Sequence, residues 1–242
     1  MMHSIDVENL SFQYPDGRQA LENISFCVSP GEKVALIGAN GSGKTTLLLH
    51  LNGILRSSNG SVTIDGLPLT DKNLNRIRAM VGFVFQNPDD QLFSTTVYED
   101  VAFGPVNMGL RENDVQQRVQ NALAAVGMQG YEQRINYHLS MGEKKRIAIA
   151  TVLSMNPEIL VLDEPSSGLD PRARRSLIDL LKSFHQQTIF ISTHDMRLAY
   201  ALSSRVIVLD AACKVAEGET MFILRDEALM LKHGLEPVNV KD

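Results

Sequence analysis

Residues 38–45 read Gly-Ala-Asn-Gly-Ser-Gly-Lys-Thr and match the phosphate-loop pattern G-x-x-x-x-G-K-[ST] over its whole length. An apolar run at residues 34–37 precedes the loop and a helical pattern follows it, which is the context that the motif requires. Glycines let backbone N–H groups turn toward bound phosphates, the lysine reaches the outer phosphates, and the hydroxyl can ligate Mg²⁺. The loop therefore predicts a site for a nucleoside triphosphate and Mg²⁺, formed by Gly38, Asn40, Gly41, Ser42, Gly43, Lys44, Thr45 and Thr46.

Three more apolar runs end in polar residues that nucleotide chemistry can use. They lead into Gln86, into the pair Asp163-Glu164, and into His194. Because ligands bind at the carboxyl ends of the strands in an open α/β sheet, parallel neighbouring strands would bring these side chains to one phosphate. Asp163 suits Mg²⁺ coordination, and Glu164 is placed to accept a proton from an attacking water. Taken alone, Gln86 and His194 are also ordinary residues for the end of a strand.

The remaining patterns predict the elements that must position these groups. Alternating segments at residues 5–10 and 24–28, separated by a Pro-Asp-Gly turn, predict an antiparallel edge, and residues 61–64 predict a further strand. Apolar residues recur at helical spacing between about 87 and 155, and a later Asp-Pro pair opens another helix. Continuous apolar runs that alternate with helices are typical of a parallel sheet covered on both faces.

The composition limits the class of protein. A chain of 242 residues with 44% hydrophobic content has room for one large domain or for a domain with an inserted lobe. Its net charge of −5 gives no electrostatic footprint for nucleic acid. Cys27 and Cys213 lie far apart without metal-binding spacing, so we expect reduced, buried thiols. No stretch approaches about 18 apolar residues, and Asp6 and Glu8 stand where a signal peptide needs its apolar core, so neither a membrane span nor secretion is expected.

The order and spacing of these motifs resemble the ATP-binding subunits of ABC transporters over nearly the whole chain. Besides the phosphate loop, the resemblance rests on the Gln86 loop, His194, and the segments Leu139-Ser140-Met141-Gly142-Glu143, Leu162-Asp163-Glu164-Pro165 and Ser167-Gly168-Leu169-Asp170. It implies an α/β fold, a P-loop NTPase of ABC type, whose mixed sheet carries an antiparallel β edge and an inserted helical lobe. The implied organisation is a single ABC ATP-binding domain over residues 1–242, with an ATP-binding core at residues 1–86 and 156–242 and a helical lobe at residues 87–155.

The resemblance also implies that the chain is an ATPase and assigns roles to the residues of the site. ATP and Mg²⁺ are the implied cofactors, and the implied roles are metal binding for Thr45, Gln86 and Asp163 and catalysis for Glu164, His194 and Gln86. Tyr14 is similar to the aromatic residue that stacks on adenine in the family, although it also fits a partly buried tyrosine at the end of a strand.

The segment at residues 139–143 resembles the signature segment of the family, which implies a head-to-tail dimer with two ATP molecules held between the subunits. Ser140 and Gly142 would then supply a hydroxyl and a backbone donor to the γ-phosphate on the other subunit. Met141 and Glu143 depart from the common form Leu-Ser-Gly-Gly-Gln, and Met141 is bulky where glycine allows close approach. The segment is also a capping box that opens a helix, and both interpretations can hold because a helix N-terminus attracts anions. A chain that carries both half-sites favours a homodimer over a pair with a sibling ATPase.

Two regions narrow the resemblance to one branch of the family. Residues 86–93 and 101–105 resemble the energy-coupling-factor transporters, and residues 142–146 are more similar to their cobalt and nickel importers than to their vitamin importers. The chain is then expected at the cytoplasmic face of the cell membrane, bound to integral membrane subunits. If exposed, an apolar groove for such a subunit would be formed by Leu92, Phe93 and Phe103. The alternative is that these three residues belong to the core of the lobe. A vitamin importer and a non-transport ABC ATPase of the iron–sulfur assembly type are the alternatives.

Overall fold

The structure, a computed structural model that describes residues 3–238, is built around two β-sheets. The larger sheet has the strand order β10-β9-β3-β8-β7-β6. Its neighbouring strands are parallel except for β9 and β10, which form an antiparallel hairpin. The strands are β3 (Lys33–Ile37), β6 (Val81–Val84), β7 (Ile159–Asp163), β8 (Thr188–Thr193), β9 (Arg205–Asp210) and β10 (Cys213–Glu219).

The smaller sheet is antiparallel and has the order β2-β1-β4-β5. Its strands are β1 (Ile5–Gln13), β2 (Gln19–Val28), β4 (Asn59–Ile64) and β5 (Leu67–Pro68). Ile5 of β1 lies opposite Val28 of β2, so the antiparallel edge predicted from the alternating segments is confirmed. The buried side chains of this sheet pack with α1 (Lys44–Leu51) against one face of the larger sheet.

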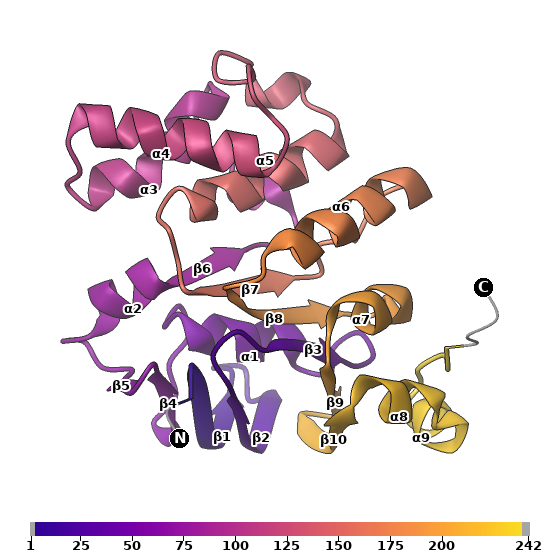
Figure 1. The fold of residues 1–242 in the computed structure, drawn as a ribbon. Helices are drawn as coiled ribbons and strands as arrows, with labels where there is room; N and C mark the ends of the chain where they lie inside the picture. The colour runs from indigo at the N-terminus through magenta and orange to yellow at the C-terminus, as the bar shows by residue number, and fades with distance from the viewer. Residues whose placement is uncertain (1–2, 239–242) are drawn as a thin grey trace.

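Helices cover the other face of the larger sheet (Figure 1). A group of helices lies at the top of Figure 1 and contains α3 (Val97–Asn107), α4 (Glu112–Ala125) and α5 (Met141–Leu153). The other helices are α2 (Leu74–Met80), α6 (Pro171–Ser183), α7 (Met196–Leu202), α8 (Thr220–Arg225) and α9 (Glu227–Lys232), with short 3₁₀ turns at Pro88–Asp90 and Asn136–His138. The mixed sheet, the antiparallel edge and the inserted helical lobe of the predicted fold are thus confirmed, while the lobe boundaries at residues 87 and 155 stay a prediction.

Strand β3 shows why the strands that lead to the functional residues are apolar at every position and not only at alternate positions. Val34 and Leu36 belong to the core shared with the small sheet, whereas Ala35 and Ile37 belong to the core under the helices. Both faces of the strand are therefore buried, as expected for a parallel sheet between two layers. A strand of this kind holds the loop that follows it against movement from either side.

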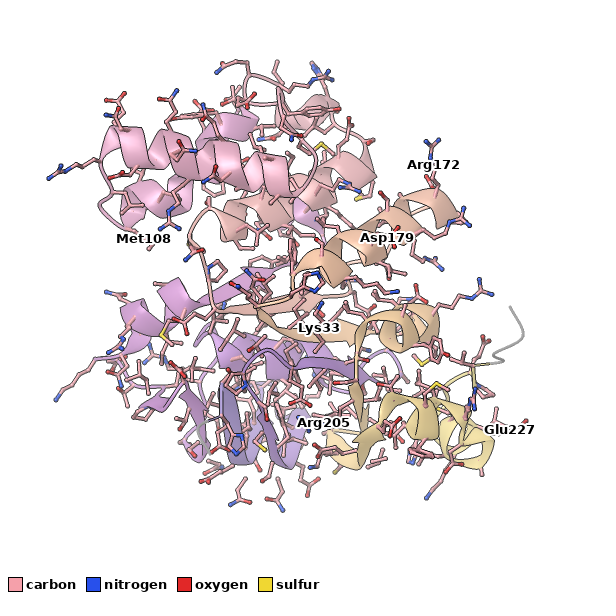
Figure 2. The ribbon with its side chains drawn as sticks, in the orientation of Figure 1. Lys33, Met108, Arg172, Asp179, Arg205 and Glu227 are labelled. Atoms are coloured by element: carbon pink, nitrogen blue, oxygen red, sulfur yellow. The ribbon has the colours of Figure 1, made fainter. Side chains whose placement is uncertain are left out.

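Arg205 joins the two sheets below the site, at the junction labelled in Figure 2. Its guanidinium donates to both carboxylate oxygens of Glu32, at 2.7 and 2.9 Å, and to the backbone oxygen of Cys27 at 2.6 Å. It also pairs with Glu217 of β10. Bidentate contacts of this kind fix the geometry of an ion pair as well as neutralise its charge. They hold β2, β9 and β10 in place relative to one another.

The predicted start of the helix at the Asp-Pro pair is confirmed, but the predicted burial of the two cysteines is wrong. Asp170 caps α6 by accepting hydrogen bonds from the backbone of Arg172 and Ala173, and Pro171 follows it. Both cysteines are free thiols but only half-buried, because each lies on a strand of the sheet edges rather than in the cores. The sequence predicts free thiols, but it does not predict how deeply these thiols are buried.

Candidate functional site

The phosphate loop connects β3 to α1 and packs tightly against two neighbouring strands. A Cβ atom on Gly38 would lie 2.2 Å from the backbone oxygen of Leu209, and one on Gly43 would lie 2.3 Å from that of Ala20. Gly43 also has a φ of +107°. Larger residues at these two positions would push the loop away from the sheet, so the glycines set its curvature. Within the same loop, Ser42 is buried and its hydroxyl has no hydrogen-bond partner among residues 3–238.

Lys44 lies inside this loop with its ammonium group directed at backbone oxygens. Its Nζ donates to the carbonyl of Gly38 at 2.8 Å and to that of Ala39 at 3.2 Å. The same Nζ is 3.7 Å from Oε1 of Glu164, and both side chains are almost completely buried. A buried cation at the centre of a loop of backbone donors is the arrangement that stabilises phosphate oxygens.

Thr45 and Asp163 form the part of the site that fits Mg²⁺. The hydroxyl of Thr45 donates to Oδ2 of Asp163 at 2.8 Å, although the two residues are 118 positions apart. Ser192 at the end of β8 donates to the other oxygen of that carboxylate. A carboxylate and a hydroxyl at this separation are hard oxygen ligands of the kind that Mg²⁺ prefers, so the predicted metal position fits the donors present.

Glu164 and His194 contact each other at the ends of the neighbouring strands β7 and β8. Oε2 of Glu164 lies 2.8 Å from Nδ1 of His194 and accepts the backbone N–H of His194 at 3.2 Å. The carboxylate is buried, whereas 56% of the histidine side chain is exposed. The predicted convergence of the strand ends is therefore present for Lys44, Thr45 and these two residues.

A cavity of about 420 Å³ collects these groups. Tyr14 stands at its edge, with its hydroxyl 3.0 Å from Oγ1 of Thr46 and the guanidinium of Arg18 4.8 Å from its ring centre. The ring is half-buried, a position open to a planar base. The residues that line the cavity are Tyr14, Arg18, Gln19, Ala20, Asn40, Gly41, Gly43, Lys44, Thr45, Thr46, Gln86, Glu164, Ser167 and His194.

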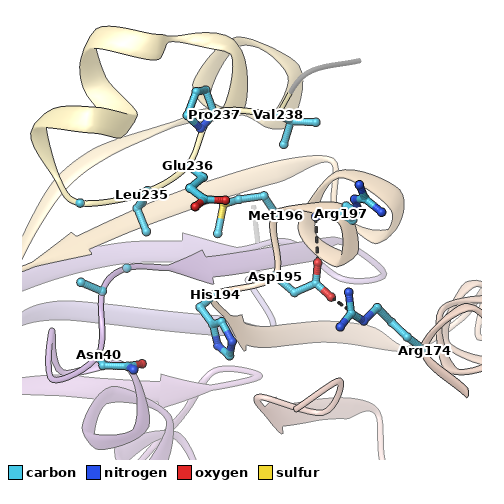
Figure 3. Close-up of a pocket in the computed structure, with 13 residues that line it drawn as sticks. Asn40, Arg174, His194, Asp195, Met196, Arg197, Leu235, Glu236, Pro237 and Val238 are labelled. Carbon is cyan, nitrogen blue, oxygen red and sulfur yellow. Dashed lines mark hydrogen bonds and ion pairs between the residues drawn. The ribbon is translucent and has the colours of Figure 1, made fainter. Parts of the chain in front are cut away.

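A second cavity of about 670 Å³ adjoins the first, and Asn40 and His194 line both. Figure 3 shows these residues on its wall, together with residues 235–238 of the C-terminal segment. Asp195 caps α7 and pairs with Nε of Arg174 from α6 at 3.2 Å, which holds α6 beside this wall. The exposed face of His194 is thus accessible from the direction of α6 and the C-terminal segment.

The signature segment lies apart from this site, at the start of α5. Neither Ser140 nor Gly142 is among the described residues that line the two cavities. Ser140 and Glu143 form the predicted capping box, in which Glu143 accepts the backbone N–H and the hydroxyl of Ser140, both at 2.8 Å. Glu143 also accepts the hydroxyl of Tyr131 at 2.8 Å. These hydrogen bonds, the one from the Ser140 backbone first, lower the pKa of Glu143 below its usual value.

The structure reveals contributors that the sequence patterns did not single out. Arg18 reaches the cavity from a turn, and Ser192 contacts Asp163 from the end of a strand. A signal for Ser192 was present in the sequence, because it follows an apolar run as His194 does. Lys145 is 5% exposed, and its Nζ donates to the backbone oxygens of Gln86 at 3.0 Å and Glu164 at 3.4 Å. Burial lowers the pKa of Lys145 to about 8, although the charges of Glu164 and Asp163 oppose that shift.

The three residues considered for a partner groove do not share one environment. Leu92 is buried in the core under the helices, so the core alternative holds for it. Phe93 and Phe103 are 66% and 51% exposed and contact each other edge to face, with ring centres 4.9 Å apart. At the C-terminal end of α3, Val106 and Met108 are exposed as well. None of the helices within residues 3–238 combines the length and apolar character needed to span a bilayer.

Known proteins share this fold and these motifs. The energy-coupling factor transporter ATP-binding protein EcfA of Methanothermobacter thermautotrophicus is 51% identical over 235 residues, which cover 96% of this chain and 76% of that protein. The structure of cbiO1 from Clostridium perfringens, part of the ABC transporter complex cbiONQ, matches with a TM-score of 0.85 and 38% identity, covering 96% of this chain and 94% of that one. A dimeric, post-hydrolysis structure of the ATP-binding cassette MJ0796 with ADP and Pi matches with a TM-score of 0.81 and 27% identity, covering 89% of this chain and 98% of that one.

The profile that describes the ABC transporter family matches residues 21–167. This range includes the phosphate loop, the Gln86 loop, the signature segment and the carboxylate pair at the end of β7. Since the match covers more than half of the chain and agrees with the geometry of the site, the chain belongs to the ABC transporter family, as an ATP-binding subunit that hydrolyses ATP.

Proposed function

We propose that this chain is the ATPase of an energy-coupling-factor importer for cobalt or nickel ions. In this proposal it works as a homodimer at the cytoplasmic face of the membrane, bound to integral membrane subunits. The observation that carries the proposed homodimer is the division of phosphate-binding groups within one chain: the cavity contains the loop and Glu164, whereas Ser140 and Gly142 lie outside it. Two copies arranged head to tail would bring the missing segment to each cavity, and the similar cassette MJ0796 is dimeric.

The proposed mechanism assigns the chemistry to this chain's own groups. The amides of the phosphate loop and Lys44 hold the phosphates, and Tyr14 packs on the adenine ring. Thr45, Asp163 and the amide of Gln86 would hold Mg²⁺, which supplies charge neutralisation at the β- and γ-phosphate oxygens. The other residues act on the attacking water and on the γ-phosphate.

Glu164 accepts a proton from the attacking water, and its contact with His194 fixes the direction of its carboxylate. The exposed part of His194 then contacts the γ-phosphate. Ser140 and Gly142 of the second subunit add donors to the same phosphate, so hydrolysis waits for closure of the dimer. This order prevents hydrolysis in a subunit that has not yet engaged its partner.

The membrane partner would bind the exposed aromatic pair Phe93 and Phe103. These rings contact each other on the helical lobe, where Val106 and Met108 are exposed as well. Contiguous exposed apolar side chains mark interaction surfaces, and an amphipathic helix is the element that fits beside them. Movement of the lobe during closure would then reach the membrane subunits.

The first test is purification of the tagged chain from its native membranes in mild detergent. We expect a scaffold-like membrane protein and a second, substrate-binding membrane protein to co-purify. Phe103→Asp should reduce that recovery, while Phe222→Asp, which alters a 73% exposed phenylalanine on α8, should leave it unchanged. Recovery of soluble partners alone would contradict the transporter assignment and favour an assembly ATPase.

The cargo is tested by uptake of labelled ions into cells that produce the complex. ATP-dependent accumulation of cobalt or nickel, abolished by Glu164→Gln, is the expected result. The support for these ions is the similarity of residues 142–146 to that subgroup and the match to a subunit of the cbiONQ complex. Uptake of a vitamin with no uptake of either ion would replace the cargo and keep the importer.

A further inference from the structure

Lys145 lies where two neighbouring strands of the larger sheet come to an end. Strands β6 and β7 are paired in register up to Val84 and Leu162; β6 ends there, whereas β7 continues for one more residue, Asp163, which pairs with Ser192 of β8. The backbone oxygens of Gln86 and Glu164 lie just past these ends, and the Nζ of Lys145 donates to both, at 3.0 and 3.4 Å. Backbone oxygens that lose their ladder partners require other donors, and one ammonium group supplies them here.

The backbone of Glu164 needs such support because its conformation is unusual. Its φ is +44°, in the left-handed region that residues other than glycine seldom adopt. The N–H of Glu164 donates to the backbone oxygen and the hydroxyl of Ser192, both at 3.1 Å. Lys145 contacts the carbonyl oxygen on the other side of the same residue. Strand β8 and helix α5 therefore fix Glu164 from its two ends.

A buried ammonium group is stable only when its hydrogen bonds and charges are satisfied. Lys145 is 5% exposed; burial lowers its pKa to about 8, and the carboxylates of Glu164 and Asp163 oppose that shift and support its charged form. A neutral side chain of the same length would fill the space without a donor for either oxygen. The ammonium group of Lys145 therefore stabilises the two strand ends and not the packing of α5.

We propose that Lys145 is a positioning residue for Glu164. It holds the backbone of that residue in the left-handed conformation and at a fixed distance from Gln86, so that the carboxylate faces His194 and Lys44. Lys145 is also on α5, two residues after the signature segment at residues 139–143. The same contact ties the carboxylate to the helix that would engage the ATP of the second subunit. The inference rests on the proposed role of Glu164.

Lys33 provides a matched control within the same chain. Its Nζ also donates to two backbone oxygens, those of Leu181 at 3.0 Å and Lys182 at 3.2 Å, and burial lowers its pKa as well. It begins β3, whereas the phosphate loop follows the end of that strand, about 13 Å away at 3.3 Å per residue. Figure 2 labels its position. Lys33→Met removes an equivalent pair of hydrogen bonds without touching the site.

The test compares the purified full-length variants by their kcat for ATP hydrolysis, their Kd for ATP and their thermal unfolding midpoints. We expect Lys145→Met to lower kcat by about 10-fold or more, since misplacement of a reacting group by 1 Å can cost about 100-fold. Its Kd should change less than about threefold, because the phosphate loop is intact. Lys145→Arg, which keeps a buried charged donor, should recover most of the lost kcat. Lys33→Met should keep kcat and lower only the unfolding midpoint.

Equal effects of Lys145→Met and Lys33→Met on kcat would overturn the proposal and leave Lys145 a structural residue. If Lys145→Met does not fold, Lys145→Gln decides, because its shorter amide cannot reach both oxygens. A folded Lys145→Gln variant with wild-type kcat would also overturn the proposal. Glu164→Gln is measured in the same assay. If that variant keeps its kcat, the proposed role of Glu164 fails; if it is inactive while the Lys145 variants are active, only the present inference fails.

Discussion

Two regions of this chain are suited to phosphate, and they are built in opposite ways. The loop at residues 38–45 joins groups that are far apart in sequence, since Thr45 contacts Asp163 and Lys44 approaches Glu164 across the ends of parallel strands. The signature segment is local: its hydrogen bonds run among Ser140, Glu143 and Tyr131, which are at most 12 positions apart in sequence. The sheet fixes the first region, whereas the second is fixed by hydrogen bonds between neighbouring parts of the chain at the start of α5.

In the proposed dimer, this difference explains how a chain that carries both regions hydrolyses ATP only after a second copy engages its site. A sheet with both faces covered keeps Lys44, Asp163 and Glu164 in place with little freedom. A helix N-terminus presents free N–H groups wherever the helix goes. The first region therefore suits binding and proton transfer, and in the proposed dimer the second suits contact with the ATP of the other subunit.

The largest expected effect comes from breaking the fixed region at Glu164. We predict that Glu164→Gln lowers kcat for ATP hydrolysis by about 100-fold or more, because it removes the general base and keeps the side-chain volume. ATP binding should persist, since Lys44 keeps its contacts with Gly38 and Ala39. Steady-state hydrolysis and equilibrium binding of ATP measure the two effects.

A matched control is Glu158→Gln, at the other end of the same strand, where the residue is exposed. This variant should hydrolyse ATP like the wild type. A wild-type rate in Glu164→Gln, or a loss of binding as large as the loss of rate, would remove Glu164 from its proposed role.

A smaller effect is expected from the signature segment at Ser140. We predict that Ser140→Ala lowers hydrolysis by about 10-fold, because one donor to the γ-phosphate is lost while the other groups remain. Binding of ATP to a single subunit should not change, as Ser140 is not among the described residues of the cavity.

The control is Thr96→Ala, which breaks the second capping box of the same lobe, between Thr96 and Glu99 at the start of α3. Each substitution removes an N-cap worth about 1 kcal/mol of stability. If both variants lose the same fraction of activity, the effect of Ser140 is that of a helix cap, and the two regions no longer differ in function.

The same contrast determines what could be predicted from the sequence. The phosphate loop and the polar residues after apolar runs were recognisable because each motif is contiguous, and the parallel sheet then brings the strand ends together. Lys145 stands in a charged run, Glu143 to Arg146, that is typical of a solvated helix face. Its burial depends on where β6 and β7 end in space, which no local pattern contains. The exposure of Phe93 beside the buried Leu92 depends on tertiary packing in the same way.

The smallest expected effect concerns Glu143, whose carboxylate distinguishes this signature segment from the form that ends in glutamine. Because its folded-state pKa is lowered, Glu143 stabilises the folded chain above its ordinary pKa of 4.5, and this contribution is lost as the pH falls through the lower folded-state pKa.

We predict that Glu143→Gln lowers the free energy of unfolding at pH 7 by less than about 1 kcal/mol, since the group is near the surface and glutamine can still accept from Ser140. The difference between the variant and the wild type should shrink as the pH falls below 4.5, which a series of denaturant titrations from pH 7 into acid can measure. Hydrolysis should change by less than about threefold, because the amide keeps the cap of the helix. A fall of 10-fold or more at unchanged stability would mean that the carboxylate acts on the nucleotide, and the signature segment would then be more than a helix cap.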